Sequence, residues 1–373
     1  MRVVLWGTYD TGKPRIRILL RGLQENGVEV IECHKDIWGG VDDKSQVRGV
    51  FNKLRLLVRW LLAYPVLVFR YLRLPRHDVV MVGYMGQLDV LVLWPFAKLR
   101  GMPMVWDAFL SLYNTVVEDR QMISSRNPLA CFLWLLEWMA CRLADCVLLD
   151  THAHADYFVD TFRVPKKKTT AVFVGAEPEA FPIAPEHSPK TDADSIILFY
   201  GQFIPLHGIE TIIRAARAAR NEPLDWVIIG SGQEAERVQA LVDIDPIPRL
   251  KWIPWVSYTE LSAWILRANV CLGIFGDTDK AARVIPNKAF QILMSGKPLI
   301  TRDSPAIREL VKPGQPGVWL VPPADPDALL RAVRAAVNEL VPADLHAAIR
   351  KRISPTAVGQ RLMVYLKFNT DWR

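Results

Sequence analysis

The sequence contains little cysteine and no apolar run long enough to cross a bilayer. Its five cysteines form an odd set without a Cys-x-x-Cys pair, which argues against a disulfide framework or a thiolate zinc site and fits a reducing, cytoplasmic location. A membrane-spanning helix needs roughly 20 mostly apolar residues, but residues 54–74 are interrupted by four arginines and a proline. The apolar start of the chain is also far shorter than a signal peptide's core. We therefore expect neither secretion nor a transmembrane helix.

Length and composition indicate about two folded domains. The chain has 373 residues, of which 51% are hydrophobic and 23% are charged, so it can bury enough apolar surface to offset chain entropy. The formal net charge is +7, which favours an anionic partner without identifying it.

Short apolar runs alternate with segments of helical period in both halves of the chain, as in βαβ units with a parallel sheet. Helices are predicted at residues 14–26 and 127–143, among others. The first half contains predicted strands at 2–6, 28–32, 78–83, 103–107, 146–150 and 170–174. The second half contains predicted strands at 196–200, 226–229, 250–253, 270–274, 299–301 and 318–321.

A stretch rich in proline and polar residues separates the two halves. It predicts a linker at 182–194 between a domain at 1–181 and a second domain at 195–353. The fold class is therefore α/β, with two doubly wound, Rossmann-like domains. Such sheets bind ligands at the carboxyl ends of their strands, so we expect the site in a cleft between the domains.

Residues 48–76 are basic and apolar and contain no acid. Two interpretations stay open: a helix lying on an anionic membrane surface, or a core helix with a solvated basic rim. The segment contains Arg48, Lys53, Arg55, Arg59, Arg70, Arg73 and Arg76.

The stretch 276–298 has the order strand, polar loop, helix, glycine, strand. Pro286 and Asn287 predict a helix start, where free N–H groups and the helix dipole favour an anion such as pyrophosphate. Lys280, Arg283 and Lys288 surround this start and suit phosphate neutralisation, although three ordinary surface cations are the alternative.

Two further turns follow predicted strands and contain glycines that allow close approach of a ligand. One contains Gly201 and Gly208, and the other contains Gly230 and Gly232. Each turn alone is a weak signal, because tight βα turns favour glycine. Three such turns in one domain favour a nucleotide site.

These stretches resemble the donor-binding domain of the GT-B glycosyltransferases, and most of all glycosyltransferase family 4 (group 1). The markers are the loop 201–208, the turn 230–232 and the segment 285–298, and the resemblance covers nearly the whole chain. It implies a C-terminal helix at 354–373 that packs back on the first domain. It also implies sugar transfer from a nucleotide-sugar donor to an acceptor hydroxyl, with retention at the anomeric carbon and no catalytic metal or other cofactor. The implied acceptor is lipid-linked or a glycan, and the implied location is cytoplasmic and peripheral to the membrane.

The chain also departs from that family. A Glu-x7-Glu element is replaced by Arg283 and Gln291, and a phosphate-binding Arg and Lys fall on Gln202 and His207. Our hypothesis is that Arg283 and Lys288 act instead as catalytic clamps on the departing nucleoside diphosphate. Gln291 retains the ability to hydrogen-bond a hydroxyl.

Three more residues are candidates for the site. The resemblance places Gly12 near the donor phosphate and Asp107 near the sugar or acceptor, with a turn or N-cap aspartate as the alternative for Asp107. Trp255 follows a strand of the donor domain at a position suited to contact a base.

The alternative function is a non-catalytic GT-B-like protein that binds a nucleotide or a partner, because the customary polar residues are missing. A nucleic-acid partner is not expected, since the cations and aromatics lie in one apolar segment. A metal site is not expected either, because His152 and His154 have no companion ligands at suitable spacing.

Overall fold

The computed structural model describes residues 1–37, 50–183, 195–339, 342 and 344–368. The chain forms two compact units, of which unit 1 comprises 1–173 with 355–373 and unit 2 comprises 174–354. Residues 184–194 of the predicted linker lie outside the described residues, as does Arg48 of the basic segment. No described helix is both long and apolar enough to span a membrane.

Unit 1 contains a parallel sheet with the strand order β2-β1-β3-β4-β5-β6. Its strands are β1 (Arg2–Gly7), β2 (Glu29–His34), β3 (Val79–Val82), β4 (Met104–Asp107), β5 (Cys146–Leu149) and β6 (Thr169–Ala171). Its α-helices are α1 (Pro14–Glu25), α2 (Val50–Arg73), α3 (Gln87–Leu99), α4 (Pro128–Leu143), α5 (His152–Phe162) and α14 (Pro355–Phe368), with a π-helix η2 (Asn114–Asp119) and a 3₁₀ turn η3 (Lys166–Lys168).

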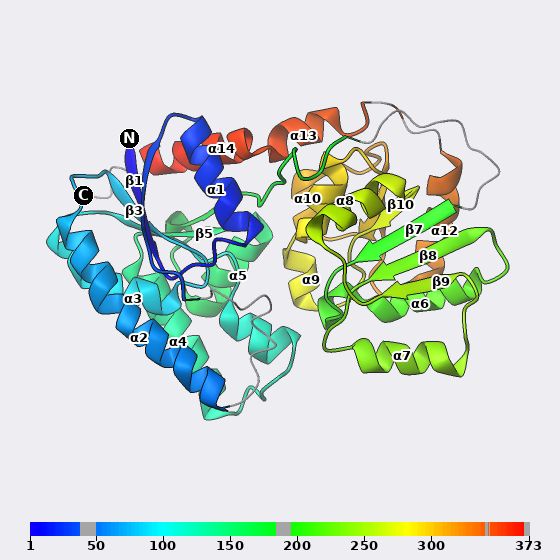
Figure 1. Ribbon diagram of the computed structural model, residues 1–373, viewed down its shortest axis with the longest axis horizontal. Coiled ribbons are helices and arrows are strands. Elements are labelled where there is room, and N and C mark those ends of the chain that lie inside the picture. Colours follow the sequence, from blue (N-terminus) through cyan, green and yellow to red (C-terminus); the bar gives the residue numbers. More distant parts are fainter. Residues whose placement is uncertain (38–49, 184–194, 340–341, 343, 369–373) are drawn as a thin grey trace. The chain divides into compact units, whose positions relative to one another are not determined.

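Helices cover both faces of this sheet, with α1 and α14 on one side and α2, α3 and α4 on the other (Figure 1). The core between the sheet and α2–α5 contains Trp6 and Trp106, which are fully buried. Helix α14 packs on α1, where a Cβ on Gly359 would overlap the backbone of Gly22. The last described helix of the chain therefore belongs to the first unit.

Unit 2 repeats the architecture with the strand order β12-β11-β10-β7-β8-β9. Its strands are β7 (Ser195–Tyr200), β8 (Leu224–Ile229), β9 (Leu250–Ile253), β10 (Val270–Leu272), β11 (Leu299–Arg302) and β12 (Val318–Val321). Its helices are η4 (Pro205–His207), α6 (Ile209–Ala218), α7 (Ala235–Ile244), α8 (Tyr258–Arg267), α9 (Asp279–Arg283), α10 (Asn287–Met294), α11 (Pro305–Leu310), α12 (Pro326–Asn338) and α13 (Ala347–Ile353).

Both sheets confirm the predicted α/β class. Every predicted strand is present, and the ends differ from the predictions by no more than about three residues, as the usual uncertainty of element boundaries allows. In each unit the strand order reverses beside the first strand, next to β1 in unit 1 and next to β7 in unit 2. Open α/β sheets bind ligands at this reversal, outside the carboxyl ends of the strands.

Candidate functional site

Two glycine turns meet at the carboxyl edge of the unit 2 sheet. Gly201 follows β7 with φ +139°, and Gly230 and Gly232 follow β8 with φ +148° and +155°. The backbone N–H of Phe203 donates to the Ser231 carbonyl over 2.9 Å, so the two turns are joined. A Cβ on Gly230 would overlap the Gly201 carbonyl oxygen. Both the positive φ values and this close approach require glycine.

The loop after β7 also closes against the end of β10, its neighbour across the strand-order reversal. The N–H of Phe275 donates to the His207 carbonyl over 3.0 Å, and that of Gly276 donates to the Leu206 carbonyl over 3.2 Å. A Cβ on Gly208 would lie 2.5 Å from the Gly276 nitrogen. The three predicted glycine-bearing stretches therefore converge on one edge of unit 2.

Lys288 lies beneath this edge. It is the second residue of α10, its side chain is buried, and its Nζ has no hydrogen-bond partner among the described residues. The Nζ atom lies 3.8 Å from the centroid of the Phe199 ring. Burial lowers the pKa of this ammonium well below its usual value.

Lys288 and His207 both lie close against Gly201. A Cβ on Gly201 would lie 2.9 Å from Lys288 Nζ and 3.1 Å from His207 Cε1. The His207 Nδ1 contacts the carbonyl oxygen of Gln202, whereas the Gln202 residue itself is exposed. We name the surroundings of these three residues, Gly201, His207 and Lys288, the Gly201 niche.

Gln291 is held by a tyrosine that the sequence analysis missed. The Tyr200 hydroxyl donates to Gln291 Oε1 over 3.0 Å, and both side chains are buried. Because Oε1 is occupied, the amide NH2 of Gln291 is the group left to donate. Burial raises the pKa of Tyr200 well above its usual value, so the hydroxyl remains a donor.

The two other predicted cations lie on α9. Lys280 is buried, Arg283 is partly exposed, and both make further interactions within the structure. Arg302, which the sequence analysis also missed, contacts the carbonyl oxygens of Gly276 and Thr278 and fixes the loop before α9. Burial lowers the pKa of Arg302.

The remaining predicted residues of unit 2 are more exposed. Pro286 and Asn287 form the predicted start of α10 and are partly buried. Trp255, after β9, is 76% exposed, so its predicted contact with a base stays a prediction. The neighbouring Trp252 instead donates its Nε1–H to the Gly230 carbonyl over 2.8 Å and supports the turn after β8.

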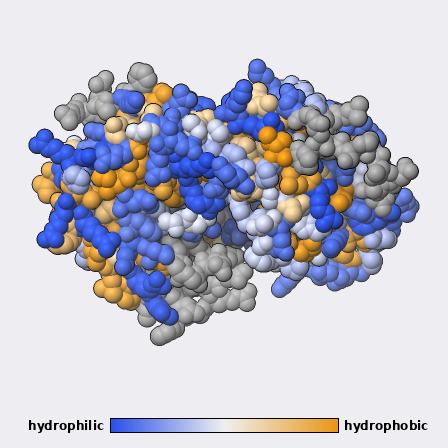
Figure 2. All heavy atoms as spheres, turned by 45° about the horizontal axis from the view of Figure 1, so that its top comes forward, coloured by the Kyte–Doolittle hydropathy of each residue, from blue (hydrophilic) through white to orange (hydrophobic). Residues whose placement is uncertain are grey.

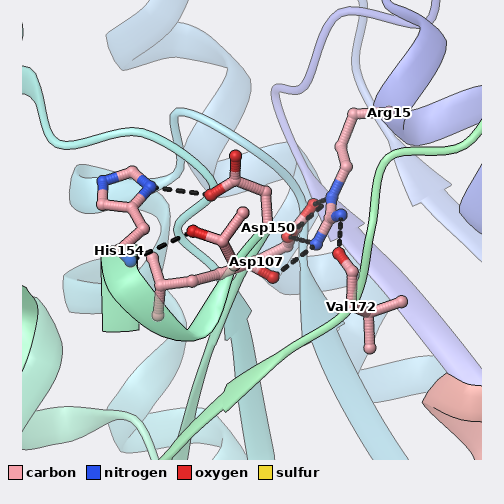
Figure 3. Close-up of polar contacts among 7 residues, drawn as sticks. Arg15, Asp107, Asp150, His154 and Val172 are labelled. Atoms are coloured by element: carbon pink, nitrogen blue, oxygen red, sulfur yellow. Dashed lines mark hydrogen bonds and ion pairs between the residues drawn. The ribbon is translucent and has the colours of Figure 1, made fainter. Parts of the chain in front are cut away.

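In unit 1 Asp107 is buried and paired, and its predicted role near the sugar or acceptor stays a prediction. This residue ends β4, is 0% exposed, and forms an ion pair of 2.8 Å with Arg15 of α1 (Figure 3). Burial raises the pKa of Asp107, whereas Arg15 opposes that rise. Asp107 is not an N-cap. It is the counter-ion that allows Arg15 to be buried.

His154 is a buried histidine with one acidic partner, Asp150. Its Nδ1 lies 2.7 Å from Asp150 Oδ1, and both side chains are buried (Figure 3). In the described part of the chain, no group of three or more His, Cys, Asp or Glu side chains could hold a metal ion. The absence of a catalytic metal stays a prediction.

The turn after β1 is fixed by a buried carboxylate that the sequence analysis missed. Asp89 Oδ2 accepts from the Thr8 N–H over 2.7 Å, and its Oδ1 accepts from the Tyr64 hydroxyl over 2.8 Å. Gly12 follows in the same turn, where its N–H donates to Asp10 over 2.9 Å. The Asp89 side chain therefore ties the turn before α1 to helix α2.

Comparison with known proteins assigns the second half of the chain. Residues 194–339 match the family model described as Glycosyl transferases group 1. The putative colanic acid biosynthesis glycosyl transferase WcaI of Escherichia coli K12 is 31% identical over 153 residues, which are 39% of this chain and 36% of that protein. The probable glycosyltransferase WbjE of Pseudomonas aeruginosa is 26% identical over 169 residues, which are 42% of this chain and 40% of that protein. The matches thus span about two fifths of these relatives.

Solved structures match the fold over almost the full length. Anabaena Alr3699/HepE in complex with UDP has a TM-score of 0.68 at 12% identity, covering 98% of this chain and 99% of that one. Sucrose-phosphate synthase from Thermosynechococcus elongatus has a TM-score of 0.70 at 16% identity, covering 99% of both chains. Residues 194–339 are thus similar to the group 1 glycosyl transferases, and the chain has the GT-B fold.

Proposed function

We propose that the protein transfers a sugar from a nucleotide-sugar donor to an acceptor hydroxyl. The observation that carries this proposal is the buried Nζ of Lys288, which has no hydrogen-bond partner among the described residues, next to the glycine turns of a region similar to group 1 glycosyl transferases. A structural neighbour that was solved with UDP and with UDP-glucose supports a nucleoside diphosphate as the ligand class.

The donor diphosphate would bind in the Gly201 niche. Lys288 would donate charge-assisted hydrogen bonds to a phosphate oxygen, and the free N–H groups at the start of α10 would add the positive end of the helix dipole. Charge builds on the diphosphate as the sugar leaves, so these groups would stabilise the transition state more than the bound donor. Arg283 is our candidate for a second group that holds the departing diphosphate. We further propose that the transfer retains the configuration at the anomeric carbon.

The same site would select the donor through neutral groups. The amide NH2 of Gln291, directed by Tyr200, would donate to a hydroxyl of the donor. An amide at this position offers a hydrogen-bond donor and, unlike a carboxylate, adds no negative charge beside the phosphates.

Nucleotide binding tests the proposal directly. We expect one member of a panel of nucleoside diphosphates and nucleotide sugars to raise the melting temperature, with about 2.7 kcal/mol of stabilisation at 100 times the Kd. Lys288→Met should weaken that binding by about thirtyfold or more, since charged hydrogen bonds contribute roughly 2–5 kcal/mol.

The matched control is Lys297→Met. Lys297 is also a buried lysine of unit 2, but its Nζ donates to the Ala268 carbonyl over 2.9 Å. This variant should lose stability and keep its nucleotide affinity. Equal affinities of Lys288→Met and wild type would contradict the assignment of the niche.

We further propose a lipid-linked or glycan acceptor, reached from the cytoplasmic face of an anionic membrane. The buried face of α2 contains Tyr64, Leu67 and Tyr71, whereas the opposite face exposes an apolar stripe. We call these residues the α2 stripe: Val58, Leu61, Leu62, Val66, Phe69 and Leu72, which are 40–68% exposed. Figure 2 shows apolar and hydrophilic surface side by side on unit 1.

Exposed arginines accompany the α2 stripe, namely Arg55, Arg59, Arg70 and Arg73. Apolar side chains flanked by arginines suit a helix that lies in an anionic lipid interface. Vesicles with 30% anionic lipid should therefore sediment the protein at low salt, and Leu62→Gln with Phe69→Gln should abolish this. Leu99→Gln, at a residue of unit 1 that is 78% exposed outside the stripe, is the control. No sedimentation of the wild type would contradict the membrane proposal alone.

The alternative is a protein that binds a nucleotide without transferring its sugar. The observation that favours it is the pair Arg283 and Gln291 at positions where the resemblance implies two glutamates. Release of free nucleoside diphosphate from a bound nucleotide sugar, with and without cell-extract acceptors, separates the two functions. Tight binding with no release in any extract would support the alternative.

A further inference from the structure

Lys288 is enclosed by groups that cannot neutralise an ammonium. The centroids of the aromatic rings of Phe199 and Tyr200 lie 3.8 Å and 5.9 Å from its Nζ, and His207, like Lys288, lies close against Gly201. The Tyr200 hydroxyl donates to Gln291 and lies 3.3 Å from the Lys288 carbonyl. Lys288 forms no ion pair within the described residues, and no acid of unit 2 is buried there.

Such surroundings favour the uncharged amine. An ammonium that leaves water without a counter-ion loses its hydration, and the face of an aromatic ring replaces only part of it. Burial is also the cause that lowers the pKa of Lys288, and no neighbouring charge contributes. A bound diphosphate would reverse this balance, because two negative charges would then lie next to Nζ.

We propose that Lys288 is a neutral amine in the empty donor site and takes up one proton when the diphosphate of the donor binds in the Gly201 niche. This inference rests on the proposed function and specifies how that same site recognises its ligand. The proton comes from bulk buffer and adds to the Nζ lone pair. No covalent bond to the ligand forms or breaks, and the proton returns to the buffer when the nucleoside diphosphate leaves.

The proposal has a consequence for affinity. Below the pKa of Lys288 in the empty site, the ammonium is already present and binding takes up no proton. Above that pKa and below its value in the complex, each binding event takes up one proton. The affinity then falls about tenfold for each unit of pH increase, by linkage between proton and ligand binding.

Calorimetric titration in buffers of different ionisation enthalpy measures the proton directly. The ligand should be a nucleotide sugar, because its diphosphate is esterified at both ends and does not titrate near neutral pH. We expect wild-type protein to take up between zero and one proton from about pH 6 to about pH 9, with uptake rising with pH.

Three variants assign the proton to its residue. Lys288→Arg remains charged at every pH tested, so it should bind without proton uptake. His207→Gln removes the other titratable group at the niche and should keep the uptake if Lys288 is its source. Lys297→Met should behave as wild type.

The outcomes separate the two proposals. Tight binding by wild type with no uptake at any pH would overturn the proton inference and leave the proposed function intact. Uptake that disappears in His207→Gln but persists in Lys288→Arg would overturn the assignment to Lys288. A wild type that binds no nucleotide sugar would overturn the proposed function together with this inference.

Discussion

The two units share one architecture, but the buried carboxylates lie in one unit and the buried lysines in the other. Within the described ranges, the buried carboxylates lie in unit 1, namely Asp89, Asp107, Asp119, Glu137 and Asp150. The buried lysines, Lys280, Lys288 and Lys297, lie in unit 2 together with Arg302. Sheet topology alone therefore does not determine which carboxyl edge suits an anion. The buried side chains beneath it do.

The buried carboxylate of Glu137 in unit 1 is hydrogen-bonded by neighbouring groups of the same unit. Glu137 accepts from Ser111 Oγ and the Leu112 N–H over 2.6 Å each, and from Gln87 over 3.0 Å. Burial raises its pKa, and these hydrogen bonds oppose the rise. Lys288 in unit 2 has no such partner. A buried polar group whose hydrogen bonds are all made within the protein stabilises the fold, whereas a buried polar group without a partner is available to a ligand.

The largest effect is expected from removing one partner of a buried ion pair in unit 1. Arg15→Met would leave the Asp107 carboxylate buried without its counter-ion, at a cost of about 3–5 kcal/mol in the free energy of unfolding. Replacing both partners, with Arg15→Met and Asp107→Leu, should recover most of that loss. Urea unfolding of the two variants measures the difference. Full stability of Arg15→Met would show that this ion pair is not needed for the fold.

A somewhat smaller effect is expected from adding a methyl group at the proposed donor site of unit 2. Gly201→Ala would place a methyl group in the Gly201 niche at a φ of +139°, and we expect nucleotide affinity to fall at least about tenfold, or 1.4 kcal/mol.

Gly314→Ala is the matched control for this variant. Gly314 also lies in unit 2 at a positive φ, +72°, but a Cβ there would contact nothing within 4 Å. Both variants should lose about 1 kcal/mol of stability from backbone strain. Affinity should fall only in Gly201→Ala, and a parallel fall in Gly314→Ala would contradict the niche.

The pH dependence of stability sharpens the comparison further. The pKa of Lys288 is lowered in the folded state, so the unfolded chain binds more protons between that pKa and about 10.4. In this window Lys288 makes the free energy of unfolding increase with pH, by at most about 1.4 kcal/mol per unit.

Lys288→Met should remove this contribution and be more stable than wild type at neutral pH, because a buried thioether needs no hydration. Chemical unfolding at several pH values tests this, with the exposed Lys312→Met as the control. A stability difference that does not change with pH would mean that Lys288 stays charged in the empty site.

The smallest effect is expected at the rim of unit 2. Trp255→Ala should lower nucleotide affinity by about 1 kcal/mol if the indole stacks on the base. Because Trp255 is 76% exposed, the melting temperature should hardly change. Ile244→Ala, at a residue of the same unit that is 83% exposed, serves as the control for lost apolar surface. Unchanged affinity of Trp255→Ala would remove this residue from the site.

The sequence predicted the strands and the glycine turns because both are local. Alternating apolar runs define a strand, and a glycine after it marks a tight turn wherever the chain lies. The segment containing Lys288 was found for the same reason, as a cation at a helix start.

The polar partnerships could not be predicted, because they join residues far apart in the chain. Tyr200 meets Gln291 across 91 positions, and Arg15 meets Asp107 across 92. The sequence places Asp107 at the end of a predicted strand, and only the position of α1 shows that it pairs with Arg15. Arg15 could have indicated a buried ion pair, because it is a charged residue on the apolar face of α1.

The contact between Gly22 of α1 and Gly359 of α14 also bears on how the protein is made. Unit 2 is one continuous stretch, 174–354, whereas unit 1 combines the first 173 residues with the last helix. During synthesis from the N-terminus, domains fold as their residues emerge. Unit 2 can therefore be completed while unit 1 still lacks the helix that covers α1. The surface of α1 that contacts α14 stays uncovered until residues 355–368 have emerged from the ribosome, so a chain stalled before them would expose it to chaperones and proteases.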